Sequence, residues 1–142
     1  MAAKRVGSVH IIKGNMNAMQ NVRILDEHVK ADGLRLCGKQ FIMQANNDPK
    51  HKSLLATKWL SRNRIKTVEW PSNSADMSPI EHMFHILKKN LRDRVIRSVE
   101  EFERILIEEW TYMPSSVTRR LVDSMLRRTE ALWKAKGAYT RY

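Results

Sequence analysis

Two side chains whose oxygen atoms could meet a metal ion lie in separate polar motifs of this chain. Asn46 belongs to the segment FIMQANNDPKH and Glu81 to the segment WPSNSADMSPIEHMF, with thirty-four residues between the two positions. Mg²⁺ and Mn²⁺ favour charged oxygen ligands, and two such ions a few ångströms apart require several of them. Glu81 offers a carboxylate, whereas the amide of Asn46 offers one neutral oxygen and a donor nitrogen that repels a cation. The pair therefore supplies a single charged ligand.

Both segments resemble the motifs of the mariner superfamily of cut-and-paste transposases, the Tc/mariner group. In that family a catalytic Asp ends a strand in a QxDNDPKH-like motif, and a Glu or Asp follows in a WPSxSPDLNPIEH-like motif. Asn46 stands at the position of that Asp, and Glu81 stands at the second acidic position. The positions that agree with the motifs are Gln44, Asn47, Asp48, Pro49, Lys50, His51, Trp70, Pro71, Ser72, Ser74, Asp76, Pro79, Ile80, Glu81 and His82, while Ala75, Ser78 and Phe84 differ.

The resemblance extends from the GNMN stretch at Gly14 to the closing segment MLRRTEALWKAKGAYTRY. In the family, paired helix-turn-helix domains and the strand with the first catalytic Asp precede GNMN. The resemblance therefore implies that residues 1–142 form one truncated catalytic domain without the helix-turn-helix domains. Of three catalytic acidic residues it retains Glu81, with Asn46 as a second vestigial position. We expect a protein that is not an active enzyme and that has lost the ancestral Mg²⁺ or Mn²⁺ site.

The composition is that of a basic protein with enough apolar residues for one domain. It has 142 residues, 42% of them hydrophobic, and a formal net charge of +11. A charge of this size predicts a polyanionic partner such as DNA or RNA, the alternative being a basic surface that binds nothing. The single Cys37 excludes an internal disulfide and is typical of a reducing compartment. With no apolar run of signal-peptide or membrane-span length, we expect an intracellular and, by the resemblance, nuclear protein.

Apolar spacing and turn residues predict alternating strands and helices, followed by helices alone. The expected strands are Val9–Ile12, Gln40–Ala45 and Ile65–Glu69, with the second buried on both faces and ending at Asn46. The expected helices run from Asn17 to a stop at Asp32-Gly33, from Asp48-Pro49 to Asn63, and over Pro79–Arg94, Val99–Tyr112 and Ser116–Lys136, the last closing at Gly137. Pro71–Ser78 is expected to be a loop.

This order predicts an α/β fold with a helical C-terminal layer. The resemblance identifies it as a partial ribonuclease H-like fold that retains about three strands. Loss of interior strands exposes backbone groups, each of which costs about 1–3 kcal/mol if it is buried without a partner. Either the Val9–Ile12 strand closes against Phe41–Ala45, or an open sheet edge invites self-association or another protein.

Several motif residues also have structural interpretations. Asp48 precedes a Pro and is expected to cap or open the following helix rather than to replace the missing carboxylate. Ser78 and Glu81 form an S-x-x-E pattern with Pro79 at the first helical position, which predicts a capping box. His82 and His85 have a spacing that suits metal ligands, but no Cys or acidic partner has matching spacing, so we expect no zinc site.

Basic residues gather on two of the C-terminal helices and beside the first motif. In a transposase such faces follow DNA phosphates, whereas the alternative is a solvated face balanced by the Glu residues at 100–109. The nucleic-acid contacts expected are Lys50, His51, Lys88, Lys89, Arg92, Arg119, Arg120, Arg127 and Arg128. The four tryptophans, Trp59, Trp70, Trp110 and Trp133, are expected in the core rather than as base-stacking groups.

The sequence therefore predicts a transposase-derived protein that has lost catalysis. Its ancestral role would be DNA cleavage and strand transfer during transposition and DNA integration, with non-specific nucleic-acid binding as the residual activity. The alternative is a protein-interaction module, or a relic without a function, that uses an open sheet edge. An active nuclease is a third hypothesis, to be abandoned if Asn46→Asp gives no nicking with Mg²⁺ or Mn²⁺.

Overall fold

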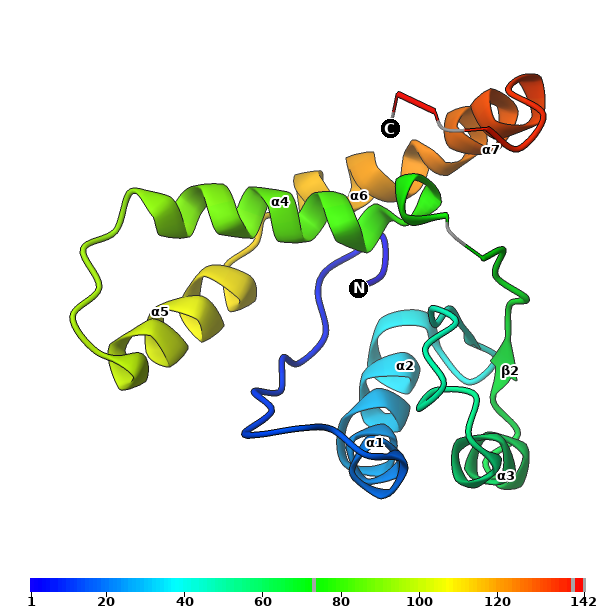
Figure 1. The fold of residues 1–142 in the computed structure, drawn as a ribbon, viewed down its shortest axis with the longest axis horizontal. Coiled ribbons are helices and arrows are strands. Elements are labelled where there is room, and N and C mark those ends of the chain that lie inside the picture. Colours follow the sequence, from blue (N-terminus) through cyan, green and yellow to red (C-terminus); the bar gives the residue numbers. More distant parts are fainter. Residues whose placement is uncertain (73, 139, 142) are drawn as a thin grey trace. The chain divides into compact units, whose positions relative to one another are not determined.

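The chain forms two compact units in the computed structural model, which describes residues 1–72, 74–138 and 140–141 (Figure 1). The first, here called the sheet unit, comprises His10–Asn73. The second, the helical unit, combines the N-terminal segment Met1–Val9 with Ser74–Tyr142. Whether both belong to one catalytic domain, as the sequence predicts, stays a prediction. No helix in the described residues is long and apolar enough to cross a membrane.

A nearly continuous helical stretch opens the sheet unit. It consists of α1 (Ala18–Ile24), the π-helical turn η1 (Leu25–Val29) and α2 (Lys30–Cys37). Asn17 caps its start, because the side-chain oxygen accepts the Gln20 N–H at 2.8 Å. The expected stop at Asp32-Gly33 is wrong, since the helix continues to Gly38, whose φ of 86° ends it.

Gly33 has a packing role rather than a terminating one. The ring of Phe41 lies directly against its Cα, in the space where any side chain would place a Cβ. Only a residue without a Cβ lets the ring approach so closely. The glycine that the sequence analysis interpreted as a helix end therefore allows the segment before the first strand to pack on α2.

The sheet consists of two short parallel strands, β1 (Ile42–Met43) and β2 (Lys66–Thr67), with Ile42 opposite Lys66 and Met43 opposite Thr67. They confirm two of the expected strands in shortened form. The expected strand at 9–12 is wrong, because these residues have no regular structure and pair with neither β1 nor β2. Burial of the second strand on both faces is also wrong, since Ile42 is 60% exposed.

Helix α3 (Leu54–Arg62) completes the sheet unit by packing against α1. It begins later than expected, because residues 49–52 form a turn and Ser53 caps the helix by accepting the Ala56 N–H at 3.3 Å. Trp59 Nε1 donates to Asp26 at 3.1 Å and Lys30 Nζ to Asn63 Oδ1 at 2.8 Å. These bonds join α3 to the first helical stretch.

Five helical elements make up most of the helical unit. They are η2 (Ala75–Met77), α4 (Pro79–Arg92), α5 (Val99–Thr111), α6 (Ser115–Asp123) and α7 (Met125–Lys134). The predicted C-terminal helices are thus confirmed, with one difference. The last is divided at Ser124, and the chain turns at Gly137 with a φ of 84°, where the sequence predicted its close.

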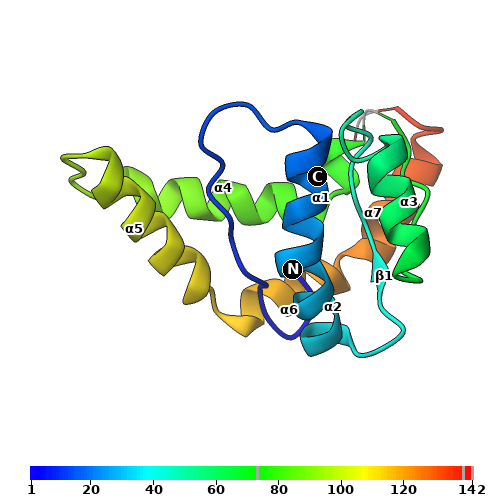
Figure 2. The ribbon, with the colours of Figure 1, turned by 90° about the horizontal axis from the view of Figure 1, so that it is seen from below.

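The core of the helical unit lies where α4, α5 and α6 meet the N-terminal segment. Its buried members are Val6, Met83, Leu87, Trp110, Met113 and Leu121. Trp110 Nε1 donates to the Gly7 carbonyl at 2.8 Å, and Thr118 Oγ1 donates to the Ala3 carbonyl at 3.0 Å. Figures 1 and 2 show this segment, in dark blue, beside α4 and α6. Residues 1–9 therefore pack with helices more than seventy positions away.

Candidate functional site: the two motif positions and the basic helices

The two motif positions lie in different units. Asn46 follows β1 in the sheet unit, and Glu81 lies in the first turn of α4 in the helical unit. The contacts of Asn46 are therefore those of the sheet unit, and the contacts of Glu81 are those of the helical unit. Both side chains belong to exposed residues.

The side chain of Asn46 is held in a local turn. Its Oδ1 accepts the Asp48 N–H at 3.3 Å and lies 2.7 Å from His51 Nδ1. Because an amide oxygen only accepts hydrogen bonds, His51 carries its hydrogen on Nδ1 in this arrangement. The neutral oxygen at this position is thus used by two donors of its own loop.

Asp48 fixes the same turn through Lys50. Its Oδ1 accepts the Lys50 N–H at 2.8 Å, and its Oδ2 lies 3.1 Å from Lys50 Nζ. The backbone bond from Lys50, followed by the side-chain bond, lowers the pKa of Asp48. The expectation that Asp48 caps the following helix is wrong, because Ser53 caps α3 and Asp48 instead closes the turn at 49–52.

Two amide side chains connect this turn to the rest of the sheet unit. Asn47 Nδ2 donates to the Trp70 carbonyl at 2.8 Å, which ties the first motif to the start of the second. The buried Asn21 of α1 donates from Nδ2 to the Lys50 carbonyl at 3.2 Å. The polar residues of the motif therefore have structural tasks within this unit.

Glu81 lines an open depression in the helical unit. The depression has a volume of about 390 Å³ and is lined by Ala75, Asp76, Glu81, His82 and His85. The capping box predicted for Ser78 is wrong, because its side chain caps nothing and the Glu81 N–H donates to the Ser78 carbonyl at 3.2 Å. The Glu81 carboxylate forms no hydrogen bond or ion pair with any described residue.

His82 and Asp76 have perturbed proton affinities in this depression. Burial, the charge of Arg128 and then that of His85 lower the pKa of His82, and its Nδ1 is buried without a partner among the described residues. Asp76 Oδ2 accepts from Thr140 Oγ1 at 2.9 Å and from the Thr140 N–H at 3.2 Å. The side-chain bond from Thr140 contributes most to lowering the pKa of Asp76.

The donor set does not fit a pair of Mg²⁺ or Mn²⁺ ions. Within residues 1–72, 74–138 and 140–141, no three His, Cys, Asp or Glu side chains converge on a point where a metal could bind. The oxygen of Asn46 is neutral and already accepts two hydrogen bonds. Glu81 is the one carboxylate of the two motif positions, and a single charge does not hold two divalent cations.

Most of the basic residues singled out in the sequence are exposed. They are Lys88, Lys89 and Arg92 of α4, Arg119 and Arg120 of α6, and Arg127 of α7. Lys50 and His51 are half-buried in the Asp48 turn. The six exposed side chains leave their charges in solvent on three helices of one unit.

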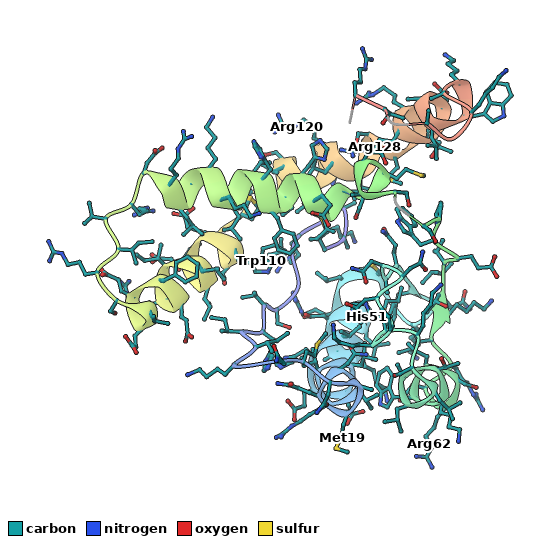
Figure 3. All side chains as sticks on the ribbon, in the orientation of Figure 1. Met19, His51, Arg62, Trp110, Arg120 and Arg128 are labelled. Carbon is teal, nitrogen blue, oxygen red and sulfur yellow. The ribbon has the colours of Figure 1, made fainter. Side chains whose placement is uncertain are left out.

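Arg128 is the exception, and its expected place on the basic surface is wrong. The residue is 2% exposed. Its Nε donates to Ser124 Oγ at 2.8 Å and its Nη1 to the Asp76 carbonyl at 2.6 Å. Arg120 and Arg128 are both labelled in Figure 3. The sequence could have indicated that Arg128 is buried while Arg120 is exposed. Arg128 follows the apolar Leu121 by seven residues, nearly two helical turns, which predicts that the two share the buried face.

The four tryptophans differ in how far they are buried. Trp110 is 6% exposed and confirms its expected core position, while Trp59 and Trp70 are half-buried. Trp133 is 81% exposed, so the prediction of a core position is wrong for this residue. Leu126, seven residues earlier on α7, is also exposed, at 79%.

Comparison with known proteins gives the following similarities. The family described as "DDE superfamily endonuclease" matches residues 2–103. The chain is 33% identical over 137 residues to the transposable element Tc1 transposase of Caenorhabditis elegans, an alignment covering 96% of this chain and 50% of that protein. It is 34% identical over 138 residues to the Tcb1 transposase of Caenorhabditis briggsae, with coverages of 96% and 50%. The chain thus spans about half the length of these curated relatives.

Among solved structures, the Mos1 transposase catalytic domain with Raltegravir and Mg superposes with a TM-score of 0.88 at 18% sequence identity. This match covers 98% of the present chain and 73% of that one. The Mos1 paired-end complex with the left transposon end gives a TM-score of 0.86 at 18% identity, covering 96% and 42%. At this identity the likeness establishes the fold, and it confirms a partial ribonuclease H-like architecture, here with two short strands.

Proposed function

Because the chain belongs to the DDE superfamily endonuclease family, within the Tc/mariner transposase group, we propose that it is a transposase-derived protein that binds nucleic acid without cutting it. The observation that carries this proposal is the set of exposed basic side chains on α4, α6 and α7. In a chain with a formal net charge of +11, such a surface favours a polyanion.

The exposed basic side chains of α4, α6 and α7 can contact a nucleic acid because most of them form no ion pair within the described residues. Within the described parts of the chain, no ion pair joins Lys88, Lys89, Arg119, Arg120 or Arg127 to a carboxylate. Lysine and arginine side chains that face solvent gain free energy by displacing the counterions condensed on nucleic acid. Since such contacts reach phosphates rather than base edges, the binding would be independent of sequence.

The relatives favour DNA as the polyanion. Two of them are transposases of transposable elements, and one superposed structure contains a transposon end. By this kinship the ancestral activity is DNA cleavage and strand transfer in transposition, and a nuclear location follows from a DNA partner.

Loss of catalysis is the second part of the proposal. Asn46 replaces a carboxylate by an amide whose oxygen already serves His51 and Asp48. Supplying a further carboxylate from another polypeptide would leave this position unchanged. We therefore assign the chain no nuclease or strand-transfer activity and no Mg²⁺ or Mn²⁺ cofactor.

Binding of a labelled DNA duplex, measured by fluorescence anisotropy at low and at physiological salt, tests the first part. The affinity of the wild-type chain should fall steeply with salt. The triple variant Arg119→Glu, Arg120→Glu, Arg127→Glu should lose most of the low-salt affinity. A matched control, Lys39→Glu, Lys58→Glu, Arg62→Glu, changes the net charge equally but acts on exposed residues of the sheet unit.

The two triple variants separate a localised surface from a general effect of net charge. A much larger loss in the helical-unit variant supports the proposal. Equal losses would mean that the positions of the charges are irrelevant, and absence of wild-type binding at low salt would overturn the proposal.

A second candidate, a protein-interaction module, is favoured by the open sheet. Ile42 is 60% exposed and Val68 45% exposed, and among the described residues β1 and β2 pair only with each other. An unpaired strand edge can accept a strand from another chain. Analytical ultracentrifugation of the wild type and of Ile42→Lys tests it, since a charge on the exposed strand should dissolve any self-association.

A further inference from the structure

The outward face of α6 and α7 carries two rows of residues at a spacing of seven. Arg119, Leu126 and Trp133 form the first row, and Arg120, Arg127 and Lys134 form the second, here called the basic row. All six residues are exposed. Within one helix, seven residues span nearly two turns and about 10.5 Å, so Leu126 and Trp133 lie on one side of α7, and so do Arg127 and Lys134.

The two helices meet at Ser124, a turn residue that accepts the first hydrogen bond of α7 and donates the last one of α6. The Ser124 N–H donates to the Arg120 carbonyl at 3.1 Å, and the Arg128 N–H donates to the Ser124 carbonyl at 3.0 Å. Ser124 itself has φ −71° and ψ −12°, within the right-handed helical region. The two helices therefore present their rows in sequence.

The opposite face of the two helices fixes which side is outward. Leu121, Ser124 and Arg128 are all buried. The Arg128 guanidinium donates to the Asp76 carbonyl of η2, which anchors α7 within the helical unit. Trp133 and Leu126 are left 81% and 79% exposed on the other side.

An indole in solvent beside a row of cations has the two parts of a single-strand nucleic-acid site. Aromatic side chains stack on unpaired bases whatever their sequence, and cations beside them follow the phosphates. Resting on the nucleic-acid binding proposed above, we propose that this face binds unpaired nucleic acid, with Trp133 stacked on a base and the basic row on phosphates.

Charge and area favour this occupant over a lipid surface. Four cations share the outward face with two acids, Asp123 and Glu130, so the excess charge is positive. A basic helix with Trp is also typical of membrane interfaces, but those helices bury a broad apolar face. Here the exposed apolar side chains of the two rows are Leu126 and Trp133 alone.

Three substitutions test stacking while leaving the charges in place. We expect Trp133→Ala to weaken binding of a thymine oligonucleotide of about 20 nucleotides by roughly five- to one-hundred-fold. Trp133→Phe, which keeps an aromatic ring, should retain most of the affinity. Leu126→Ala is the matched control, because it removes an equally exposed apolar side chain without a ring, and its affinity should stay near that of the wild type.

Two further readouts complete the experiment. The oligonucleotide should quench the tryptophan fluorescence of the wild type more than that of Trp133→Phe. Glu130→Gln should tighten binding by removing a negative charge from the face. Circular dichroism checks that each variant stays folded, which the exposure of these side chains leads us to expect.

The outcomes distinguish this inference from the proposed function. Wild-type affinity of Trp133→Ala for the single strand would overturn stacking, while salt-sensitive duplex binding that depends on Arg119, Arg120 and Arg127 would leave the proposed function standing. Equal losses in Trp133→Ala and Leu126→Ala, together with binding to vesicles containing phosphatidylserine, would overturn stacking in favour of a lipid surface. A loss specific to Trp133→Ala and to unpaired nucleic acid supports the inference.

Discussion

The sheet unit and the helical unit bury very different amounts of their residues. In the described part of the sheet unit, the buried residues are Asn21, Leu25 and Ala56. The helical unit buries a continuous cluster that includes Met83, Leu87 and Trp110. Because burial of apolar side chains is the main stabilising contribution to folding, most of the stability of the chain should reside in the helical unit.

The two units also differ in the hydrogen bonds around their motif positions. In the sheet unit, the turn at Asn46 is held by polar bonds among motif residues, since Asn47 donates to the Trp70 carbonyl and the Lys50 N–H donates to Asp48. In the helical unit, Glu81 keeps its carboxylate but forms no bond with a described residue. The local structure at Asn46 therefore depends on hydrogen bonds that an amide at this position accepts.

The largest effect should come from the centre of the helical core. Met83 is 0% exposed, and Met83→Ala should lower the free energy of unfolding by about 2–5 kcal/mol, because the lost packing leaves a cavity. The matched control is Met19→Ala in the sheet unit, where the side chain is 73% exposed and the change should stay within about 0.5 kcal/mol. Urea unfolding followed by circular dichroism measures both, and similar losses would contradict the comparison between the units.

The next effect concerns the buried cation of the same unit. Arg128→Ala should cost about 1–3 kcal/mol, because it leaves the Asp76 carbonyl and the Ser124 hydroxyl without their charged donor. Arg127→Ala, one position earlier and exposed, should have almost no effect on stability. The same urea titration compares the two variants. If Arg127→Ala were the more destabilising, the outward and inward faces of α7 would be assigned the wrong way round.

Arg127 and Arg128 show which features of the helical unit could be predicted from the sequence. Apolar spacing placed the helices of the helical unit to within about two residues at most ends, because amphipathic periodicity is strong there. It did not separate Arg127 from Arg128, because the two are adjacent members of one run of basic residues. The seven-residue spacing from Leu121 would have assigned Arg128 to the buried face, and the same spacing from Arg127 would have assigned Lys134 to the exposed face.

In the sheet unit, fewer of the elements predicted from the sequence are confirmed. The β-branched run at 9–12 is not a strand, because β propensity is realised only where a partner strand is available. The sequence predicts a helix end at Gly33, although the role of this residue depends on Phe41, a contact that only the folded structure brings about. Asn46 was placed correctly after a strand, but the helix expected from Asp48-Pro49 is a turn at 49–52, and the bonds of the motif residues to Trp70 and to α1 could not be predicted from spacing.

A smaller effect should appear at acid pH. The side-chain bonds from Arg94 and then Asn90 lower the pKa of Glu109. A carboxyl group whose pKa is lower in the folded state stabilises the fold above its unfolded pKa of about 4.3, and that contribution is lost as the pH falls through the folded pKa. Arg94 is 54% exposed, so the contribution should be only about 0.2–1 kcal/mol.

Glu109→Gln isolates this contribution. The variant should be less stable than the wild type near neutral pH, and the difference should shrink below about pH 4. Arg94→Ala should reproduce the effect, and the double variant should add little, since both substitutions remove one interaction. Urea midpoints measured across the pH range test this, and a difference that persists unchanged at low pH would refute the electrostatic explanation.

The smallest effect is expected at the motif position Asn46. Asn46→Asp keeps an oxygen within reach of the Asp48 N–H and of His51 Nδ1, so stability should change by less than about 0.5 kcal/mol. The substitution gives the two motif positions two carboxylates, and two charges still fall short of what two divalent ions require. A supercoiled plasmid incubated with the variant and Mg²⁺ or Mn²⁺ should therefore stay intact. Nicking by Asn46→Asp but not by Asn46→Asp, Glu81→Gln would show that the remaining positions suffice for catalysis, and that a single amide separates this chain from an active nuclease.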